Sequence, residues 1–209
     1  MRPIFITGTG TQVGKTLVAA IITEALQADY WKPIQAGYEG GTDSLMVQQL
    51  ISNKKTIIHS ELYRLAMPAS PHISAALENK KVKIKKIITH IPPTKNQLIV
   101  EGPGGLLVPL NENKFVVDLI KKMKARVIIV SKNELGSINH SLLTAAVLRK
   151  EKIKVVGWIF TENFMNYEQQ IATWSGYPVI AFVRHLHMIS KEKIKAEAKA
   201  MLPQLQKFL

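Results

Sequence analysis

The sequence predicts an α/β fold in which helices cover both faces of a doubly wound, mostly parallel sheet. Apolar runs that suit strands alternate along the chain with segments of helical periodicity. The strand-like runs are continuous, as in "VIIV" at residues 127–130, and continuous apolar runs are typical of strands covered on both faces. The chain has 209 residues and no internal repeat, linker or low-complexity tract, so we expect a single domain over residues 1–209.

Six strands are expected, each on a short apolar run. The runs contain "IFI", "YW", "LIV", "VIIV", "VVGWIF" and "VIAFV". The predicted ranges are Pro3–Thr7, Tyr30–Ile34, Gln97–Val100, Arg126–Val130, Val155–Phe160 and Val179–Val183. Ligands of such sheets bind beyond the carboxyl ends of the strands, so the residues that follow each strand are the candidates for chemistry.

Seven helices are expected between and after these strands, because apolar residues recur there at helical spacing. The predicted ranges are Lys15–Gln27, Ser44–Ser52, Lys83–His90, Phe115–Lys124, Ile138–Arg149, Tyr167–Trp174 and Ser190–Leu205. The last segment is rich in helix formers and is expected to pack against the sheet edge or a second subunit.

The chain is basic, with 28 Lys and Arg residues against 15 Asp and Glu residues and a formal net charge of +13. A basic surface attracts nucleic acid or anionic lipid. The lysines here are scattered over segments of helical spacing and are not interleaved with aromatic residues, as a nucleic-acid groove would require. We interpret them as solvated faces and expect no nucleic-acid partner.

The sequence also bears on the compartment. It contains no cysteine, which excludes disulfides and thiolate metal ligands. No apolar run approaches the roughly 18 residues that a membrane-spanning helix needs. The first residues enter a strand without the pattern of a secretory signal. These features predict a cytoplasmic protein without a membrane partner.

A glycine-rich loop follows the first strand and opens the first helix. It reads "GTGTQVGKT" from Gly8 to Thr16. Backbone N–H groups of such a loop point at phosphate oxygens, and the helix N-terminus adds a positive dipole. Lys15 would reach the β- and γ-phosphates of a nucleotide, and the Thr16 hydroxyl would ligate Mg²⁺. The loop predicts a P-loop NTPase-like domain, and the alternative is a glycine-rich turn that caps a helix by chance.

The loop is one residue longer than the common form. In G-x-x-x-x-G-K-[ST], four residues separate the two glycines. Here five residues, Thr9 to Val13, separate Gly8 from Gly14.

Lys32 and Asp43 follow the second strand. Pro33 holds Lys32 extended, so its ammonium would be aimed at the phosphates and would stabilise charge that develops during phosphoryl transfer. Asp43 stands at a helix start after Thr42 and is a candidate Mg²⁺ ligand. The alternatives are an ordinary surface lysine and an N-capping role at the start of the helix.

Glu101 follows the third strand in "LIVEGPGG". A carboxylate at the end of a core strand is unfavourable unless it is paired or bound to a cation. Mg²⁺ usually takes one or two carboxylates with phosphates and water, so Glu101 would complete a set with Thr16 and Asp43. The glycines predict a loop that approaches phosphate closely, and a bare turn would explain them but not Glu101.

Together these segments resemble the dethiobiotin synthetase family. The resemblance rests, in chain order, on "TGTGTQVGKT", "WKPIQAG", "TDSLMVQ", "PASPHISAA", "VEGPGGLLVPL" and "LGSINHSLLTAAVL". These segments span most of the chain from residue 7 to about residue 160. The longer phosphate loop is a mark of this family, and "SPH" and "GSINH" are more specific than any phosphate loop.

The resemblance implies an ATP-dependent cyclo-ligase of biotin biosynthesis that acts as a homodimer. The family takes 7,8-diaminopelargonate, CO₂ (or bicarbonate) and Mg-ATP. One amine of the substrate forms a carbamate, and a carbamate oxygen attacks the γ-phosphate to give a carbamic-phosphoric anhydride. The second amine then closes the ureido ring, which gives dethiobiotin, ADP and phosphate.

The resemblance also implies roles for residues of this chain. Lys15 and Lys32 would be catalytic, with Lys32 between the carbamate and the γ-phosphate. Thr16, Asp43 and Glu101 would hold Mg²⁺. The ATP-binding residues would be Gln12, Val13, Gly14, Lys15, Thr16, Leu17, Asp43, Glu101, Gly102, Pro103, Gly104 and Thr161. The substrate-binding residues would be Thr11, Gln12, Lys32, Ala36, Ser137 and Asn139. Ser137 would cap a helix whose start serves the neighbouring subunit.

The chain departs from the family at five places. Gln12 stands for a loop Glu that helps to position the diamine, Gly10 for an acidic residue, and Ala36 for a substrate-contacting Ser. Thr161 stands for an adenine-binding Asn, and "AFVRHL" at residues 181–186 stands for a "GxIP"-like stretch. We therefore hypothesise relaxed selectivity for the nucleotide base, which strict ATP dependence would refute.

Two other classes fit parts of the sequence. An amide-forming relative such as cobyrinic acid a,c-diamide synthase needs a nucleophilic cysteine, which this chain lacks. A ParA- or MinD-like partition ATPase, a nucleotide-switched binding module, carries a signature Lys earlier in the loop, where Gly10 and Thr11 stand here. That class gives no role to "SPH" or "GSINH", and DNA-stimulated ATPase activity would favour it.

His185 and His187 are two residues apart and would share one face of a strand. A metal pair is conceivable there. We favour ordinary polar histidines, because no third ligand is near in the sequence.

Overall fold

The computed structural model describes residues 1–184 and 188–209. Within these residues the largest sheet has seven strands in the order β11-β10-β9-β1-β6-β2-β4, and all neighbouring pairs are parallel. The strands are β1 (Ile4–Gly8), β2 (Asp29–Trp31), β3 (Ile34–Ala36), β4 (Ile58–His59), β5 (Tyr63–Leu65), β6 (Leu98–Gly105), β7 (Pro109–Asn111), β8 (Lys114–Phe115), β9 (Arg126–Lys132), β10 (Val155–Thr161) and β11 (Val179–Val183). The predicted α/β fold with a doubly wound, mostly parallel sheet is confirmed.

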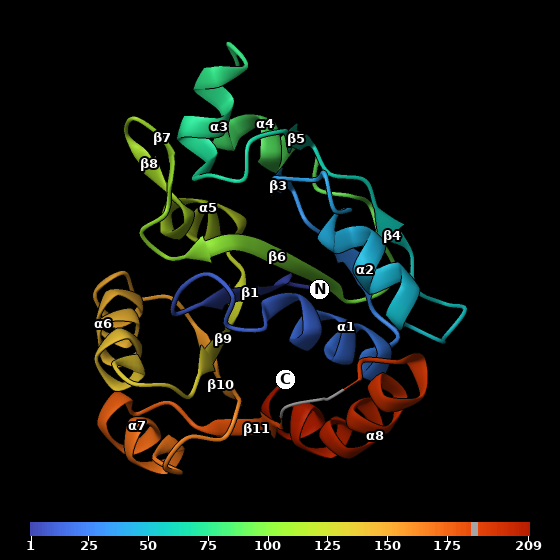
Figure 1. The fold of residues 1–209 in the computed structure, drawn as a ribbon, viewed down its shortest axis with the longest axis vertical. Helices are drawn as coiled ribbons and strands as arrows, with labels where there is room; N and C mark the ends of the chain where they lie inside the picture. The colour runs from blue at the N-terminus through green and yellow to red at the C-terminus, as the bar shows by residue number, and fades with distance from the viewer. Residues whose placement is uncertain (185–187) are drawn as a thin grey trace.

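Helices cover both faces of this sheet (Figure 1). They are α1 (Lys15–Leu26), α2 (Asp43–Leu50), α3 (Pro71–Leu77), α4 (Ile84–Thr89), α5 (Val116–Met123), α6 (Ser137–Lys150), α7 (Glu168–Ser175) and α8 (Lys191–Phe208). All seven predicted helices are present, with ends that differ by at most three residues. None of the helices in the described part of the chain is long and apolar enough to cross a bilayer.

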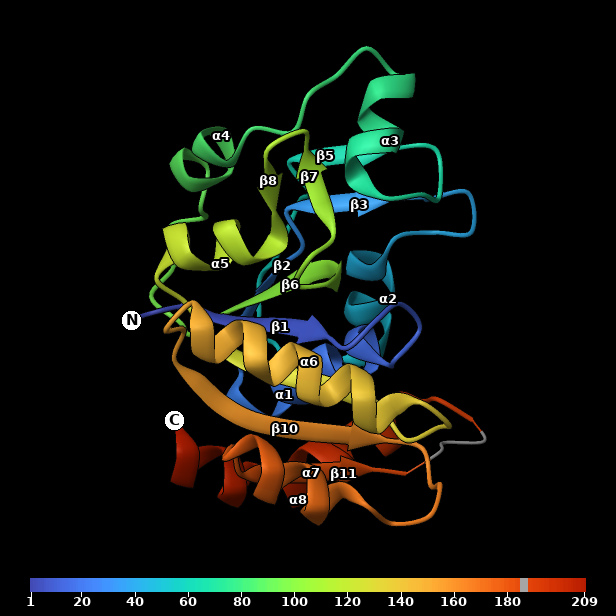
Figure 2. The ribbon, with the colours of Figure 1, turned by 90° about the vertical axis from the view of Figure 1, so that its left-hand side faces the viewer.

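The pleat of β1 sorts its side chains between two hydrophobic cores. Ile4 and Ile6 pack in the core formed with α1, α2 and α8, whereas Phe5 packs in the core formed with α4, α5, α6 and α7. In Figure 2 α6 faces the viewer, with α5 above it and α7 below it. Both faces of the sheet are therefore buried, which explains the continuous apolar runs.

The second predicted strand, Tyr30–Ile34, is wrong as a single element. The chain leaves the large sheet after Trp31, and Ile34 begins β3, which pairs with β5 in a separate two-stranded sheet. Pro33 has no N–H to donate to a ladder, so the large sheet cannot continue through it. The Pro33 carbonyl instead accepts from the Tyr63 N–H at 2.9 Å. Lys32 is thus held between two strands.

The third predicted strand is too short, because β6 continues through Glu101 and the glycines that were expected to form a loop. Gly8 of β1 lies opposite Gly105 of β6. At Gly102 a Cβ would lie 2.5 Å from Cε1 of the buried Phe5 side chain on β1. Glycine at this position therefore lets β6 pass close to Phe5. Five short elements were not predicted: α3, β4, β5, β7 and β8.

Candidate active site

The loop between β1 and α1 curls over the start of the helix. Gly14 precedes α1 in the left-handed region with φ 87°, and Gln12 is also left-handed with φ 57°. A Cβ at Gly8 would lie 2.6 Å from Cγ2 of Val13, so the turn closes tightly on itself. Such a curl directs backbone N–H groups toward an anion at the helix N-terminus.

Lys15 is the first residue of α1, and its ammonium lies within the curl. Its Nζ donates to the Gly10 carbonyl at 2.8 Å, and the residue is only 8% exposed. Burial lowers the pKa of Lys15 to about 8, because desolvation and the nearby Lys32 outweigh the attraction of Glu101 and Asp43.

Thr16, Lys32, Asp43 and Glu101 meet beside this loop. The Thr16 Oγ1 lies 3.1 Å from Asp43 Oδ1 and 3.0 Å from Glu101 Oε1. The Lys32 Nζ donates to Glu101 Oε1 at 2.8 Å and also to Asp43 Oδ2. Four residues that are distant in the sequence, on α1, after β2, on α2 and on β6, therefore form one cluster, as the sequence predicts.

Lys32 and Glu101 form the buried centre of the cluster, where one ammonium meets two carboxylates. Lys32 is 6% exposed and Glu101 1%. Burial alone would lower the pKa of Lys32, but the carboxylates of Glu101 and Asp43 more than offset it and hold the pKa above its ordinary value. Lys32 is therefore an ammonium across the neutral pH range, and the view of it as an ordinary surface lysine is wrong.

Asp43 is left available to the cluster because Thr42 takes the capping role. The Thr42 Oγ1 accepts from the Leu45 N–H at 3.2 Å, which caps α2. Gln35 of β3 fixes the same turn, since its Oε1 accepts from the Asp43 N–H at 3.2 Å and its Nε2 donates to the Gly37 carbonyl at 2.7 Å.

Tyr30 of the adjacent strand β2 holds the other oxygen of Glu101. The Tyr30 hydroxyl donates to Glu101 Oε2 at 2.8 Å, and the side chain is fully buried. Burial and the Glu101 carboxylate raise the pKa of Tyr30 well above its usual range, so the hydroxyl keeps its proton. Sequence reasoning missed Gln35 and Tyr30. A signal existed for Gln35, because it is a polar residue within an apolar run.

The remaining nucleotide-site candidates lie around the loop. Thr11 and Gln12 are exposed on it. The Thr161 hydroxyl, at the end of β10, donates to the Val13 carbonyl at 3.0 Å. This hydrogen bond ties the end of β10 to the loop. A Cβ at Gly104 would lie 3.8 Å from Cγ2 of Thr11, which places β6 beside the loop. Gly102 and Pro103 precede Gly104 on the same strand.

Of the predicted substrate residues outside the loop, Lys32 belongs to the cluster, whereas Ala36, Ser137 and Asn139 make no hydrogen bond or ion pair with it in the part of the chain that the structure describes. Ala36 is half-buried in β3, and Asn139 is exposed on α6. The helix cap predicted at Ser137 is wrong: Gly136 is the N-cap, and the Ser137 hydroxyl lies 2.6 Å from the Tyr167 hydroxyl. Ser137 is the first residue of the helix itself, and because the Tyr167 hydroxyl donates to the Glu134 carbonyl at 2.9 Å, the Ser137 hydroxyl donates to Tyr167.

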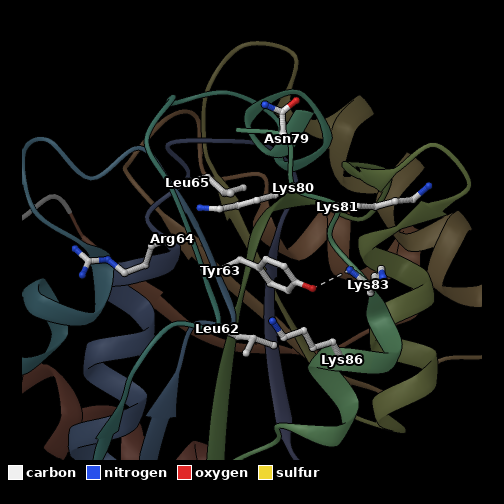
Figure 3. A pocket seen from close by; sticks show the side chains of 9 residues that line it. All are labelled: Leu62, Tyr63, Arg64, Leu65, Asn79, Lys80, Lys81, Lys83 and Lys86. Carbon is white, nitrogen blue, oxygen red and sulfur yellow. Dashed lines mark hydrogen bonds between the residues drawn. The ribbon is translucent and has the colours of Figure 1, made fainter. Parts of the chain in front are cut away.

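Two cavities differ in their surroundings. A cavity of about 150 Å³ adjoins the phosphate loop and is lined by Gln12, Gly14, Leu17, Lys132, Thr161, Glu162, Val183, Arg184 and Ile189. A cavity of about 480 Å³ lies among β5, α4 and the turn after α3, where lysines surround Tyr63 (Figure 3). Lys80 and Lys81 there pair with Glu78 and Glu112 at 2.6 Å. These pairs fit the view of the lysines as a solvated face.

The cluster fits a magnesium ion by its donor set. Its hydroxyl and two carboxylates offer hard oxygen ligands, and Mg²⁺ is usually held by one or two carboxylates together with phosphates and water. Among residues 1–184 and 188–209, no three His, Cys, Asp or Glu side chains are grouped to hold a metal. His185 and His187 lie outside the described residues.

A parallel sheet whose first strand leads into such a loop, with Lys and Thr at the helix start, defines a P-loop nucleoside triphosphatase. Residues 2–193 match a family model described as an AAA domain. The fold resembles that of the cell division ATPase MinD of Pyrococcus furiosus, with a TM-score of 0.64 and 14% identity over 100% of both chains. MinD of Pyrococcus horikoshii, solved with Mg-ADP, gives a TM-score of 0.63 and 15% identity over 99% of this chain and 95% of that one. These likenesses show the fold alone.

Within this class the chain belongs to the dethiobiotin synthetase family. It is 46% identical to the ATP-dependent dethiobiotin synthetase BioD of Cytophaga hutchinsonii over 200 residues, which are 95% of this chain and 96% of the relative. It is 48% identical to that of Christiangramia forsetii over 160 residues, 77% and 76% of the two chains. Members of the family are ATP-dependent ligases that form C–N bonds. The family resemblance read from the sequence is confirmed.

Proposed function

We propose that this protein converts 7,8-diaminopelargonate, CO₂ and ATP to dethiobiotin, ADP and phosphate in biotin biosynthesis. The observation that carries the proposal is the meeting of Lys15, Thr16, Lys32, Asp43 and Glu101 beside the phosphate loop. This meeting occurs in a chain 46% identical to a named dethiobiotin synthetase.

The loop would hold the nucleotide. Backbone N–H groups of residues 12–17 would contact the phosphates, and the Lys15 ammonium would exchange its bond to the Gly10 carbonyl for phosphate oxygens. Gly102, Pro103 and Gly104 on the adjoining strand and Thr161 beside the small cavity would complete the ATP site. Thr16, Asp43 and Glu101 would hold Mg²⁺, which would neutralise phosphate charge when bound.

Lys32 would bring two anions together. A substrate amine attacks CO₂ and loses a proton to give a carbamate. A carbamate oxygen then attacks the γ-phosphorus, and the bond to the ADP oxygen breaks. The Lys32 ammonium, which its two carboxylates keep protonated, would neutralise both anions as they approach. The second amine then attacks the carbonyl carbon of the anhydride and expels phosphate.

The diamine would lie against Thr11, Gln12, Lys32 and Ala36. Ser137 and Asn139 would serve the site of a second copy, as the family resemblance implies, and the exposed position of Asn139 on α6 leaves it accessible to one. The proposed assembly is therefore a cytoplasmic homodimer.

The test is a turnover assay with Mg-ATP, bicarbonate and diaminopelargonate. We expect phosphate release that requires the diamine, together with a ring-closed product identified by mass spectrometry. Phosphate release that ignores the diamine but rises with DNA would overturn the proposal in favour of a partition-type ATPase.

A further inference from the structure

We propose that Tyr30 occupies one carboxylate oxygen of Glu101, leaves only the other oxygen facing the cluster, and thereby makes the metal site favour Mg²⁺ over Ca²⁺. The inference rests on the proposed function, in which Glu101 is a metal ligand. It assigns a role to Tyr30, a residue that contacts neither nucleotide nor substrate in that proposal and acts only by positioning Glu101.

The two oxygens of Glu101 have different surroundings. Oε1 faces the cluster, 3.0 Å from the Thr16 hydroxyl and 2.8 Å from the Lys32 ammonium. Oε2 faces away from these groups and accepts the Tyr30 hydroxyl at 2.8 Å. The carboxylate is thus held at both ends, and its plane is fixed.

The Tyr30 hydroxyl is committed to this contact. Tyr30 is the middle residue of β2, lies opposite Ile99 of the adjacent strand β6, and is 0% exposed. Within the described part of the chain its hydroxyl makes one hydrogen bond, the one to Glu101. A buried hydroxyl without a partner is unfavourable, so Tyr30 opposes any rotation of Glu101 that would pull Oε2 away.

The restriction matters differently for the two cations. Ca²⁺ takes about 6–8 oxygen ligands in flexible geometry and often binds a carboxylate through both oxygens. Mg²⁺ requires near-ideal octahedral geometry at about 2.0–2.1 Å and keeps several waters. A glutamate that can offer only Oε1 therefore suits Mg²⁺ and denies Ca²⁺ one of its ligands.

The experiment measures the affinity of the protein for ADP in the presence of Mg²⁺ or Ca²⁺ by calorimetry. In the unsubstituted protein each cation should tighten ADP binding, and Mg²⁺ should be preferred over Ca²⁺ more strongly than free ADP prefers it. Tyr30→Phe should reduce this preference about fivefold or more, mainly through tighter binding with Ca²⁺.

Tyr63→Phe is the matched control. It also removes the hydroxyl of a buried tyrosine. That hydroxyl accepts from the Lys83 backbone N–H at 3.0 Å, and it belongs to the lysine-lined cavity and not to the phosphate loop (Figure 3). This variant should keep the Mg²⁺ preference of the unsubstituted protein. An equal loss of preference in both variants would mean a general structural effect and would overturn the inference.

The outcomes separate this inference from the proposed function. If neither cation tightens ADP binding and Glu101→Ala changes nothing, the metal role of Glu101 fails and the inference fails with it. If both cations act but Tyr30→Phe keeps the original preference, only the inference fails. Should Tyr30→Phe not fold, the unsubstituted protein still decides, because a preference no greater than that of free ADP contradicts the role of Tyr30.

Discussion

Asp29 and Glu101 are both buried carboxylates, and they are held in different ways. Asp29 begins β2, is 0% exposed, and accepts from the Ile57 N–H at 3.0 Å, from Asn96 Nδ2 at 3.0 Å and from the Thr94 hydroxyl. These three donors are neutral and precede strands of the sheet, and the His59 imidazole lies farther off, with Nε2 3.5 Å from Asp29 Oδ2. Glu101 lies in the middle of β6, opposite Ile6 of β1, and its oxygens meet an ammonium and two hydroxyls.

The difference separates a structural carboxylate from a functional one. The donors of Asp29 serve the fold: the Ile57 N–H would lose its acceptor if the carboxylate moved, and Thr94 and Asn96 would keep only their longer contacts to the Asn96 and Lys55 carbonyls. Glu101 and Asp43 instead share the Lys32 ammonium, and the one proton of the Thr16 hydroxyl can serve only one of them at a time. Such shared contacts can be exchanged for a metal ion and phosphates, whereas those of Asp29 cannot.

Lys32→Ala should have the largest effect on turnover. A small effect would contradict the distinction between the functional surroundings of Glu101 and the structural surroundings of Asp29. Removing a fixed cation that stabilises developing charge should lower kcat about 10²–10³-fold, while ADP binding persists through the loop and Lys15. Single-turnover phosphate release and ADP calorimetry measure the two effects. Lys54→Ala, which removes an exposed lysine, should leave both unchanged. Retained turnover in Lys32→Ala would mean that the cluster is structural, like the surroundings of Asp29.

Asp29→Ala should show the opposite behaviour. It leaves the Ile57 N–H and the Thr94 and Asn96 side chains without their acceptor, so the free energy of unfolding should fall by roughly 3 kcal/mol. Urea unfolding at neutral pH measures this loss. The kcat per folded molecule should stay the same, and a loss of kcat without a loss of stability would contradict a purely structural Asp29.

The pH dependence of stability sharpens the role of Asp29. Burial raises the pKa of Asp29, but hydrogen bonds from Asn96, Thr94 and Ile57 outweigh it, so the folded pKa lies below the ordinary value of 3.8. A folded pKa below the unfolded one means that the carboxylate stabilises the fold above pH of about 4 and that this contribution is lost as the pH falls further. The stability advantage over Asp29→Asn should therefore shrink as the pH falls from about 4 toward 3. An advantage that grows as the pH falls from about 4 to 3 would show the opposite shift of the Asp29 pKa.

The same contrast shows what the sequence alone could predict. Lys15, Thr16, Lys32, Asp43 and Glu101 were predictable because each lies at the end of a strand-like run or at the start of the helix that follows one, and these points meet at one edge of a parallel sheet. The contact of Tyr30 with Glu101 could not be predicted. It requires β2 and β6 to be neighbours in the sheet, and no local sequence pattern indicates which strands pair. The change of sheet at Pro33 and the length of β6 likewise depend on pairing with β5 and β1, distant in the chain.

Thr161→Val should have the smallest effect, and it tests the nucleotide side of the site. The substitution keeps a methyl group against Gly14 and removes the hydrogen bond to the Val13 carbonyl, so it loosens the loop without enlarging the cavity. The loss of one hydrogen bond of about 1 kcal/mol corresponds to a rise of about fivefold in the KM for ATP, with kcat nearly constant. Thr23→Val is the control, since the Thr23 hydroxyl is buried without a hydrogen-bond partner among the described residues.

Because the Thr161 hydroxyl donates its one proton to the Val13 carbonyl, it has no proton left to donate to the base. We therefore expect comparable turnover with ATP, GTP and CTP, and Thr161→Val should raise the three KM values by the same factor. Steady-state kinetics with each nucleotide in both proteins decides this. Two outcomes would contradict this expectation: turnover with ATP alone, or a rise of the KM in Thr161→Val for ATP alone. Either would mean that Thr161 contacts adenine and gives up its bond to the loop when the nucleotide binds.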